Sequence, residues 1–450
     1  MISRRAICLG SVAAVGVLHL PSFGQEAVAP DVMIAPSSTF FDITSNIEDL
    51  INAFVEKSGL GARESRGELA LLRGVAPVNV PSSNSDWVKH RSLAYDMALR
   101  TAKAEWVSRQ NKTMTASLVS RAYQAAKQEP PPFKIDEIVK PAQLAEIIAK
   151  VQALGIGQLD QALRELGIDP AKYEKVPSAQ RHVQLSNDMF KVMTTRSVGD
   201  LVGLTTVQTF EGYDGKGNHQ IGVVAVVSPK MKSFAQSVLR LRGNFPADTS
   251  KAQDLSIFTT NKDALLQDFG TRWIYDQDGL PVLVSFYQWG LNNAGNDPVL
   301  GAQIRQMALR QATELADFQI AQFLASNATL TSRTEVGERY EKAVERAVDG
   351  YIADTGATTQ LIDGLDQVFD ERARVENLTG LRTLTTWGAK HPVGGQMVVG
   401  VIRVWSAASE QATRAVKDSR PLAPPTTPQA APGGAPGATQ GRDFNRANDF

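Results

Sequence analysis

Two stretches rich in apolar and β-branched residues dominate the chain, and a glycine-rich turn interrupts each of them. The first runs from Gly203 to Ser228 and the second from Gly380 to Ser406. Both are rich in Val and Thr, which fit the pleated surface of a strand. Two strand-like runs around a short glycine-containing turn indicate a β-hairpin. The pattern therefore predicts one hairpin in each half of the chain.

The second strand of each hairpin predicts which side faces the core. With Gly222 aligned to Gly400, alternation places the same kind of apolar side chain on one face of both hairpins: Val224, Val226, Ile402 and Val404. We expect this face to be buried, with the two glycines allowing a helix to approach closely. The opposite face carries Ala225 in one hairpin and Arg403 in the other, so we expect it to be at least partly accessible.

Other elements recur around the hairpins in the same order. The order in each half is helix, strand, helix, hairpin, helix. The first half and the second half contribute, in turn, the first helix at Asn46–Phe54 and Asn261–Phe269, the strand at Leu69–Gly74 and Pro281–Gly290, the second helix around Met97–Arg100 and Met307–Arg310, and the last helix at Met231–Leu241 and Ser409–Val416. The third pair shares the tetrapeptide Met-Ala-Leu-Arg. We interpret the shared order as an ancient duplication. The alternative is that alanine-rich helices and Thr/Val hairpins resemble one another in any protein.

Alanines recur every four residues in the third pair of elements, at Ala94, Ala98 and Ala102 and at Ala308, Ala312 and Ala316. This spacing puts small side chains on one face of a helix. Such a face can lie close against a sheet. We therefore predict an α+β fold with two homologous units, each a small antiparallel sheet packed against helices.

The expected organisation has five parts: a signal peptide at 1–24, an extended lead-in at 25–45, a first unit at 46–245 with a helical insertion at 129–181, a second unit at 261–418, and a tail at 420–450. The insertion contains amphipathic helical runs near Ala142–Leu154 and Leu159–Leu166. The tail is rich in Pro, Ala and Gly, which predicts disorder. Its last residues include Phe444 and Phe450, which belong either to a docking peptide or to a passive tail.

The N-terminus has the pattern of a secretory signal. Arg4 and Arg5 precede the apolar run Ala6–Leu20, and small residues at Ser22 and Gly24 suit cleavage before residue 25. An N-terminal membrane anchor is the alternative, and both general and twin-arginine export stay open. We expect a periplasmic or secreted bacterial protein with peripheral or no membrane contact.

Composition narrows the function further. The 450 residues are 43% hydrophobic, enough for more than one core, and Lys+Arg and Asp+Glu are equal at 47 each. A neutral balance gives no electrostatic case for nucleic acid. Cys8 is the only cysteine and lies in the expected signal, so the mature chain would have neither a disulfide nor a cysteine metal site.

No motif for catalysis, cofactor binding or metal binding stands out. Four histidines lie beyond the expected signal, at His90, His182, His219 and His391, and their spacing forms no local metal motif, so we expect them at the surface or in hairpins. The segments 213–218 and 276–279 superficially resemble calcium loops but lack the closing Glu, so we expect plain turns. A pair of carboxylates distant in sequence stays possible.

Aromatic residues on the predicted strands are Tyr287, Trp289, Trp387 and Trp405. They belong either to the core or to an exposed binding patch, and core packing is the commoner role.

The segments Leu71–Ala76, Ala94–Ala104 and Leu204–Val227 together resemble the small envelope domains of bacterial flagellar-assembly protein T and related outer-membrane lipoproteins. The resemblance implies a non-enzymatic role in envelope assembly through protein contacts. This chain differs from those proteins in having no lipobox and in carrying the pattern twice.

We therefore expect an exported, non-catalytic protein that contacts envelope proteins, with no cofactor. The alternatives are a periplasmic protein that binds a small ligand in a cleft between the two units, and a hydrolase that uses dispersed acidic residues.

Overall fold

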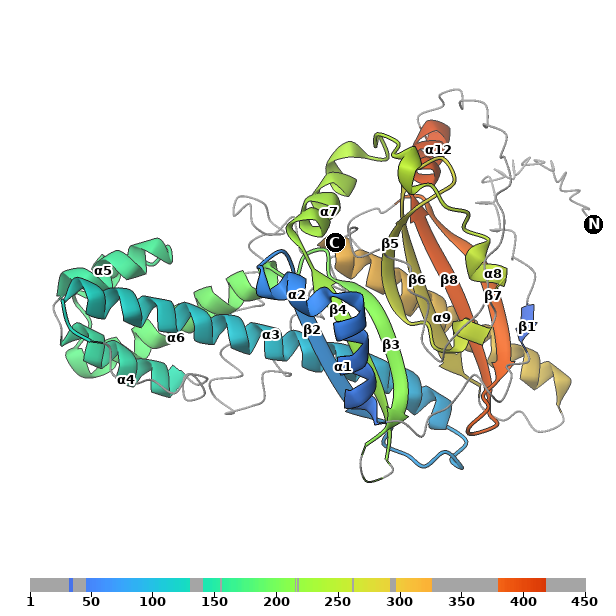
Figure 1. The fold of residues 1–450 in the computed structure, drawn as a ribbon, viewed down its shortest axis with the longest axis horizontal. Coiled ribbons are helices and arrows are strands. Elements are labelled where there is room, and N and C mark those ends of the chain that lie inside the picture. Colours follow the sequence, from blue (N-terminus) through green and yellow to red (C-terminus); the bar gives the residue numbers. More distant parts are fainter. Residues whose placement is uncertain are drawn as a thin grey trace, which may run out of the picture.

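The computed structural model describes residues 32–34, 46–129, 141–153, 156–214, 216, 218–260, 263–291, 297–325 and 379–417. These residues form two sheets and surrounding helices, which confirms the predicted α+β class (Figure 1). The expected signal peptide at 1–24 and the tail at 420–450 lie outside the described residues, as does most of the lead-in at 25–45.

Both predicted hairpins are present, and each lies in a different sheet. The first sheet has the order β2-β4-β3, with β2 at Ala70–Pro77, β4 at His219–Val227 and β3 at Thr205–Tyr213. The second has the order β1-β7-β8-β6-β5, with β1 at Val32–Ile34, β7 at Leu381–Lys390, β8 at Met397–Ser406, β6 at Pro281–Gly290 and β5 at Gly270–Tyr275. All pairings are antiparallel except that of β1 with β7.

The two hairpins share fine details of backbone geometry. In each, the register shifts at one residue of the first strand, Val207 in β3 and Leu384 in β7. Both hairpins are preceded by a glycine with positive φ, Gly203 at 75° and Gly380 at 88°. A Cβ on either glycine would lie within 2.7 Å of the backbone of the helix that follows the hairpin. These helices are α7 (Pro229–Leu241) and α12 (Ala407–Lys417).

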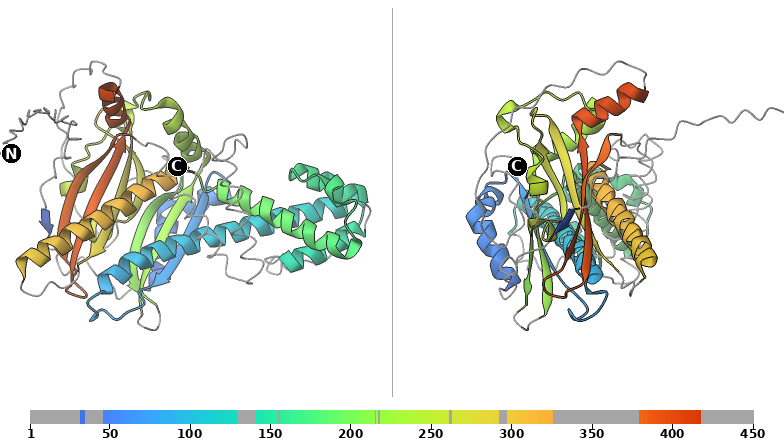
Figure 2. Two further views of the ribbon diagram at one scale, coloured as in Figure 1. Left: turned by 180° about the vertical axis from the view of Figure 1, so that it is seen from behind. Right: turned by 90° about the vertical axis from the view of Figure 1, so that its right-hand side faces the viewer.

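The alanine stripes lie against the sheets, as predicted. They belong to α3 (Trp87–Ala125) and α9 (Pro298–Ala325), which lie on the same side of the molecule (Figure 2). All six alanines are buried. The glycine that lets α3 approach is Gly74 of β2, where a Cβ would stand 2.0 Å from the carbonyl oxygen of Ala98. We expected Gly222 and Gly400 in this role, and that assignment was wrong.

Gly222 faces the opposite side of its sheet. There α1 (Ile47–Ser58) and α2 (Leu60–Ser65) cover the strands, and a Cβ on Gly222 would meet Ile47 and Ile51. Val224 and Ile402 are fully buried as expected, but the other face is buried too. A sheet covered on both faces loses the alternation of polar and apolar positions, which is why β4 is nearly all apolar.

Arg403 was expected on an accessible face and is in fact buried. Its guanidinium lies 2.7 Å from Asp317 of α9 and also donates to the hydroxyl of Thr383. A buried arginine is tolerated here because its charge and its donors find partners.

Two details of the predicted correspondence between the halves were wrong. Of the helix expected at 261–269, the described residues 263–269 contain a short 3-10 helix, η5 (Asp263–Leu266), which follows a one-turn helix α8 (Ile257–Thr260) and is no counterpart of the 12-residue α1. The second pair of strands also aligns differently from the expectation, in which the end residues Gly74 and Gly290 correspond. In the first sheet, Gly74 pairs with Val223. The counterpart of Val223 in the second sheet is Val401, and it pairs with Tyr287 instead of Gly290.

Helices from the insertion form an arm that projects from the sheets (Figure 1). The amphipathic runs become α4 (Pro141–Gln152) and α5 (Ile156–Glu165), as predicted. After η3 (Pro170–Tyr173), α6 (Ser178–Gly199) leads back to β3. We define the helical arm as the described residues from 108 to 199. None of the described helices is both long and apolar enough to cross a membrane.

Candidate functional site

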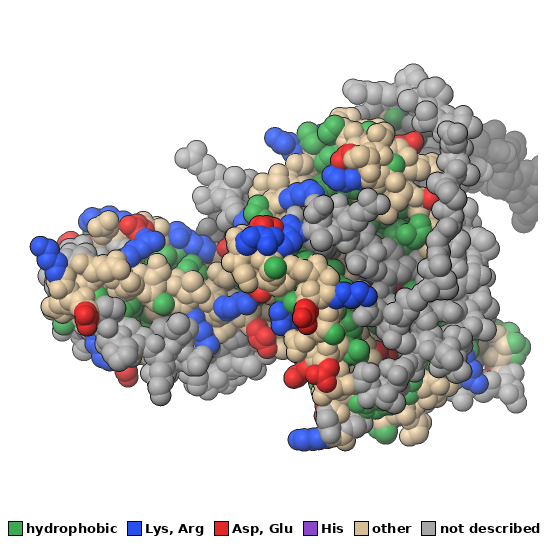
Figure 3. Space-filling view, viewed as in Figure 1, with side chains coloured by type: hydrophobic (Ala, Val, Ile, Leu, Met, Phe, Trp, Pro, Cys, Tyr) green, Lys and Arg blue, Asp and Glu red, His purple; other side chains and the backbone are tan. Residues whose placement is uncertain are grey.

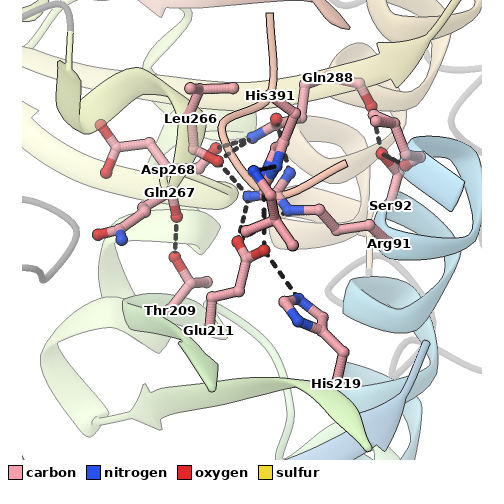
Figure 4. Close-up of polar contacts among 12 residues, drawn as sticks. Arg91, Ser92, Thr209, Glu211, His219, Leu266, Gln267, Asp268, Gln288 and His391 are labelled. Carbon is pink, nitrogen blue, oxygen red and sulfur yellow. Dashed lines mark hydrogen bonds and ion pairs between the residues drawn. The ribbon is translucent and has the colours of Figure 1, made fainter. Parts of the chain in front are cut away.

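A group of polar side chains is buried where α3 meets the second sheet, and Arg91 lies at its centre (Figure 4). Arg91 has no exposed surface. Its Nε and Nη2 lie 2.8 and 2.6 Å from Oε2 of Glu211 on β3. Its Nη1 donates to Oε1 of Gln288 on β6 at 2.8 Å, and Nη2 also donates to the carbonyl oxygen of Leu266 in η5.

The second carboxylate oxygen of Glu211 faces two histidines. His219, the first residue of β4, has its Nε2 at 2.8 Å from Oε1. His391, directly after β7, has its Nε2 at 3.5 Å from the same oxygen. The Nδ1 of His391 accepts a hydrogen bond from the backbone N–H of Val393, which leaves the proton on Nε2, directed at Glu211.

Trp87 closes the group on the α3 side. Its ring makes edge-on contacts with both imidazoles, at centroid distances of 5.0 Å to His219 and 4.8 Å to His391. Phe269 lies beneath the guanidinium of Arg91 at 5.2 Å. Aromatic rings on two sides exclude water, and so each charge inside depends on its partner. We call these residues the buried node: Trp87, Arg91, Glu211, His219, Gln288 and His391.

The charges of the node follow from burial and pairing. Burial by itself would raise the pKa of Glu211, but Arg91, His391 and His219 together outweigh it, and the pKa lies well below the usual value. Burial lowers the pKa of His391 to about 3, with the attraction of Glu211 opposing and the repulsion of Arg91 adding to the effect. At neutral pH the ionised pair is therefore Arg91 and Glu211, and His391 is uncharged.

The node draws residues from both halves of the chain. Arg91, Glu211 and His219 precede residue 245, whereas Leu266, Gln288 and His391 follow residue 261. Both oxygens of Glu211 and all three nitrogens of the guanidinium are occupied by partners within the protein. This arrangement is suited to fixing one sheet against the other, because its strongest groups are already paired.

Two of the histidines lie at hairpin turns, which is one of the two expected locations. These residues, His219 and His391, are both buried. His90 and His182 are partly exposed, and His182 contacts the side-chain oxygen of Gln152 in the arm.

The partners of these histidines were missed in the sequence. Glu211 and Gln288 each lie within a run of strand-forming residues that is otherwise mostly uncharged. Such a residue in a buried strand needs a partner, and that need was the available signal. Nothing in the sequence shows that Arg91, 120 residues before Glu211, is this partner.

The two loops that resemble calcium sites form hairpin turns, as expected. Oδ1 of Asp214 accepts from the backbone N–H groups of Lys216 and Asn218, both at 2.8 Å. Asp276 accepts in the same way from Asp278 and Leu280 at 3.0 and 2.8 Å. Across the described ranges, no group of three or more potential metal ligands occurs.

The strand aromatics pack mainly in the core, as the commoner role predicted. Tyr287, Trp387 and Trp405 are buried, and Trp289 is partly exposed. The Nε1 of Trp405 donates to Glu410, and the hydroxyl of Tyr287 donates to Asp96 of α3.

Comparisons with known proteins show similarity to proteins whose printed descriptions state no function. A family model described as a domain of unknown function (DUF6844) matches residues 144–240, which extend from α4 to α7. A crystal structure of a hypothetical protein from Francisella tularensis is similar over 84% of this chain and 95% of its own, with 18% identity and a TM-score of 0.45. No curated protein matches the chain.

Proposed function

We propose that this protein is an exported, non-catalytic envelope protein that acts by binding other proteins, and that the helical arm is its binding element. The observation that most supports the proposal is the arm itself. It extends away from both sheets and presents helices to the surroundings on several sides (Figures 1 and 3). Apart from Arg109 at its base, the arm extends beyond the sheets, and an element of this size needs a role other than completing their cores.

A continuous helix and a packed interior stiffen the arm. Helix α3 has 39 residues, so at about 1.5 Å per residue it is about 58 Å long and continues unbroken from the sheets into the arm. Buried apolar side chains of the arm continue the core that α3 shares with the sheets: Leu144, Ile148, Leu159, Leu163, Leu185 and Met189. A continuous helix packed against this interior keeps the arm rigid.

A buried polar contact fixes the base of the arm. The side chain of Asn111 on α3 donates to the hydroxyl of Thr194 and accepts from that of Ser197, both at 3.0 Å and both on α6. Directed hydrogen bonds in a helix pair set the register of one helix against the other. The arm therefore leaves the sheets at a defined angle.

Export is the second part of the proposal, and it is supported by the sequence pattern of Arg4, Arg5 and Ala6–Leu20. Fractionation of the producing cells tests it. Recovery of the chain outside the cytoplasm, beginning at residue 25, would support export. An intact N-terminus retained in the cytoplasm would contradict it.

We also propose that the two units arose by duplication. The shared strand order (β2-β4-β3 and β6-β8-β7), the matching register shifts and the matching glycines before each hairpin support a common plan. Statistically significant alignment of the two halves across many related sequences would support this origin, and its absence would count against it.

Site-specific photo-crosslinking tests the role of the arm. A photo-reactive amino acid at Val183, which is 53% exposed on α6, should capture a partner in the living cell. The matched control is Val416, which is 70% exposed on α12 of the second unit. Capture at Val183 but not at Val416 would support the proposal. Equal capture at both positions, or none at Val183, would contradict it.

An armless variant provides the complementary test. Because Asn111 and Thr194 are in contact, a short Gly/Ser loop can replace residues 113–192 without stretching the chain. Both sheets should remain folded, as measured by circular dichroism, while the crosslinked partner is lost. Retention of that partner by the armless variant would place the binding surface elsewhere.

The alternative of a small-ligand protein with a cleft between the units receives less support. Arg91, Glu211 and His391 occupy the contact between the sheets and pair with one another there. A small molecule that raises the melting temperature in a thermal-shift screen would revive this alternative.

A further inference from the structure

The buried node joins two sheets that share no backbone ladder. Strand β3 of the first sheet lies against β5 of the second, but the strands pair only with neighbours in their own sheets. Contacts across the boundary are made by side chains instead. They include the stacked rings of Tyr95 and Phe269 at 4.7 Å and a hydrogen bond from the hydroxyl of Thr209 to the carbonyl oxygen of Gln267. These contacts carry no charge, whereas the node brings titratable side chains of both halves together.

The groups that face the two imidazoles come from several elements. Helix α3 contributes Arg91, β3 contributes Glu211 and Tyr213, β4 contributes His219, and the turn after β7 contributes His391. Strand β6 contributes the uncharged Gln288, and η5 contributes only the backbone carbonyl of Leu266. Figure 4 shows the side chain of Asp268, just before β5, directed away from both imidazoles. Glu211 is thus the acid that both imidazoles contact.

We propose that His391 makes the node an acid-operated latch, which holds the two sheets together while its imidazole is neutral and releases them when that imidazole binds a proton. The closed node contains one positive and one negative charge, on Arg91 and Glu211. Protonation of His391 would place a second positive charge beside that pair in a fully buried site. Such an excess of like charge is relieved when the sheets part and the imidazole of His391 reaches solvent.

The low pKa of His391, about 3, agrees with this direction. In the open state the imidazole would regain an ordinary pKa of about 6.5. Protons therefore bind the open state first as the pH falls. Below about pH 6.5, exposure of His391 makes opening about tenfold more favourable per pH unit, until His391 is also protonated in the closed state. The midpoint of opening should therefore lie between about pH 3 and pH 6.5.

Distance measurements on the full chain test the latch. Cys8 is the only cysteine, so a Cys8→Ser chain with Lys57→Cys on α1 and Val416→Cys on α12 carries one label on each half for energy transfer. We expect transfer to change reversibly in acid while the helical circular dichroism signal stays constant. His391→Gln should lower both the midpoint and the number of protons bound on opening. The matched controls His90→Gln and His182→Gln lie outside the node and should leave both unchanged.

Some outcomes would overturn the proposal. One is a constant transfer efficiency until the helices unfold, and another is a midpoint that shifts equally in His391→Gln and the controls. Because a node variant can fail to fold, imidazole NMR of the otherwise unmodified chain gives a second reading. His391 should titrate over the same pH interval in which transfer changes. Titration of His391 without a change in transfer, or a change in transfer without titration of His391, would also refute the latch.

Discussion

The two sheets share a strand plan but differ in how their edges are closed. In the first sheet, the side chains of Glu64 and Arg109 cover the outer edge at β2: one accepts from the backbone N–H of Leu71 and the other donates to its carbonyl oxygen. In the second sheet, the corresponding strand β6 is covered by another strand, β5. Charged side chains and added strands are two different solutions to an exposed edge.

The sheets also differ in what their matching positions carry. Counting from the glycines before the hairpins, Glu211 of the first sheet corresponds to Gly388 of the second, and Ala225 corresponds to Arg403 by strand register. Each sheet thus places a charged residue where the other has a small one. A common backbone plan can therefore hold different buried ion pairs, one within the first half at its boundary with the second and one within the second half.

Of the substitutions that probe these ion pairs and contacts, Glu211→Gln should cause the largest loss in the free energy of unfolding. It leaves the guanidinium of Arg91 buried without its counter-charge, which typically costs about 3–5 kcal/mol of the free energy of unfolding. Urea denaturation of the variant and the parent measures the difference. A loss below about 1 kcal/mol would mean that water reaches the node and screens Arg91.

Acid should weaken the folded state through the same node. His391 has a pKa of about 3 when folded and about 6.5 when unfolded, so the unfolded chain binds the proton first as the pH falls. Its contribution is complete above about pH 6.5 and is lost toward pH 3, at up to about 1.4 kcal/mol per pH unit. Glu211, whose folded pKa is depressed, adds a further loss below about pH 4.3.

Urea denaturation at several pH values measures this slope. The variant His391→Gln should flatten it between about pH 6.5 and pH 4.5, whereas His90→Gln should not. Parallel curves for the parent and His391→Gln would show that His391 is already accessible to protons in the folded state.

Gly74→Ala should destabilise the first unit at the contact between β2 and α3. The new Cβ would stand 2.0 Å from the carbonyl oxygen of Ala98, so the helix must shift, at a cost of about 1–3 kcal/mol. Gly61→Ala in α2 is the control, because its nearest neighbour is the end of the Val55 side chain at 3.3 Å. Thermal melting compares them, and equal melting temperatures would contradict close packing of α3.

Asp317→Asn should have the smallest of these effects. Arg403 is buried, but the side chain of Asp317 is 31% exposed, and solvent screens a pair of this kind. We expect a loss of about 1 kcal/mol in urea denaturation. A loss as large as that of Glu211→Gln would show that the two ion pairs are equally dry and would remove the contrast between the sheets.

Local pattern predicted much of the fold. The hairpins, the alanine-lined helices and the helices of the insertion followed from residue spacing, because each is a local property of the chain. The burial of both sheet faces did not follow, since Arg403 suggested an accessible side until its partner Asp317 was seen. The helix expected at 261–269 failed for a different reason: a spacing shared with α1 does not produce a helix where β5 begins at Gly270.

The node was beyond reach of the sequence because its members are far apart. His219 and His391 lie in the hairpins of different halves of the chain, and no spacing rule connects them. What the sequence did contain was Glu211 and Gln288 within strand-like runs. A search for partners of buried polar residues would have pointed to the node without naming Arg91.

The coupling energy between Arg91 and Gln288 tests most directly whether the node joins the two halves. These residues come from different halves, and Nη1 of Arg91 lies 2.8 Å from Oε1 of Gln288. A double-mutant cycle with Arg91→Met and Gln288→Leu should give an interaction energy of about 1 kcal/mol or more, as expected for a buried hydrogen bond to a charged group. Additivity within about 0.3–0.5 kcal/mol would contradict the account.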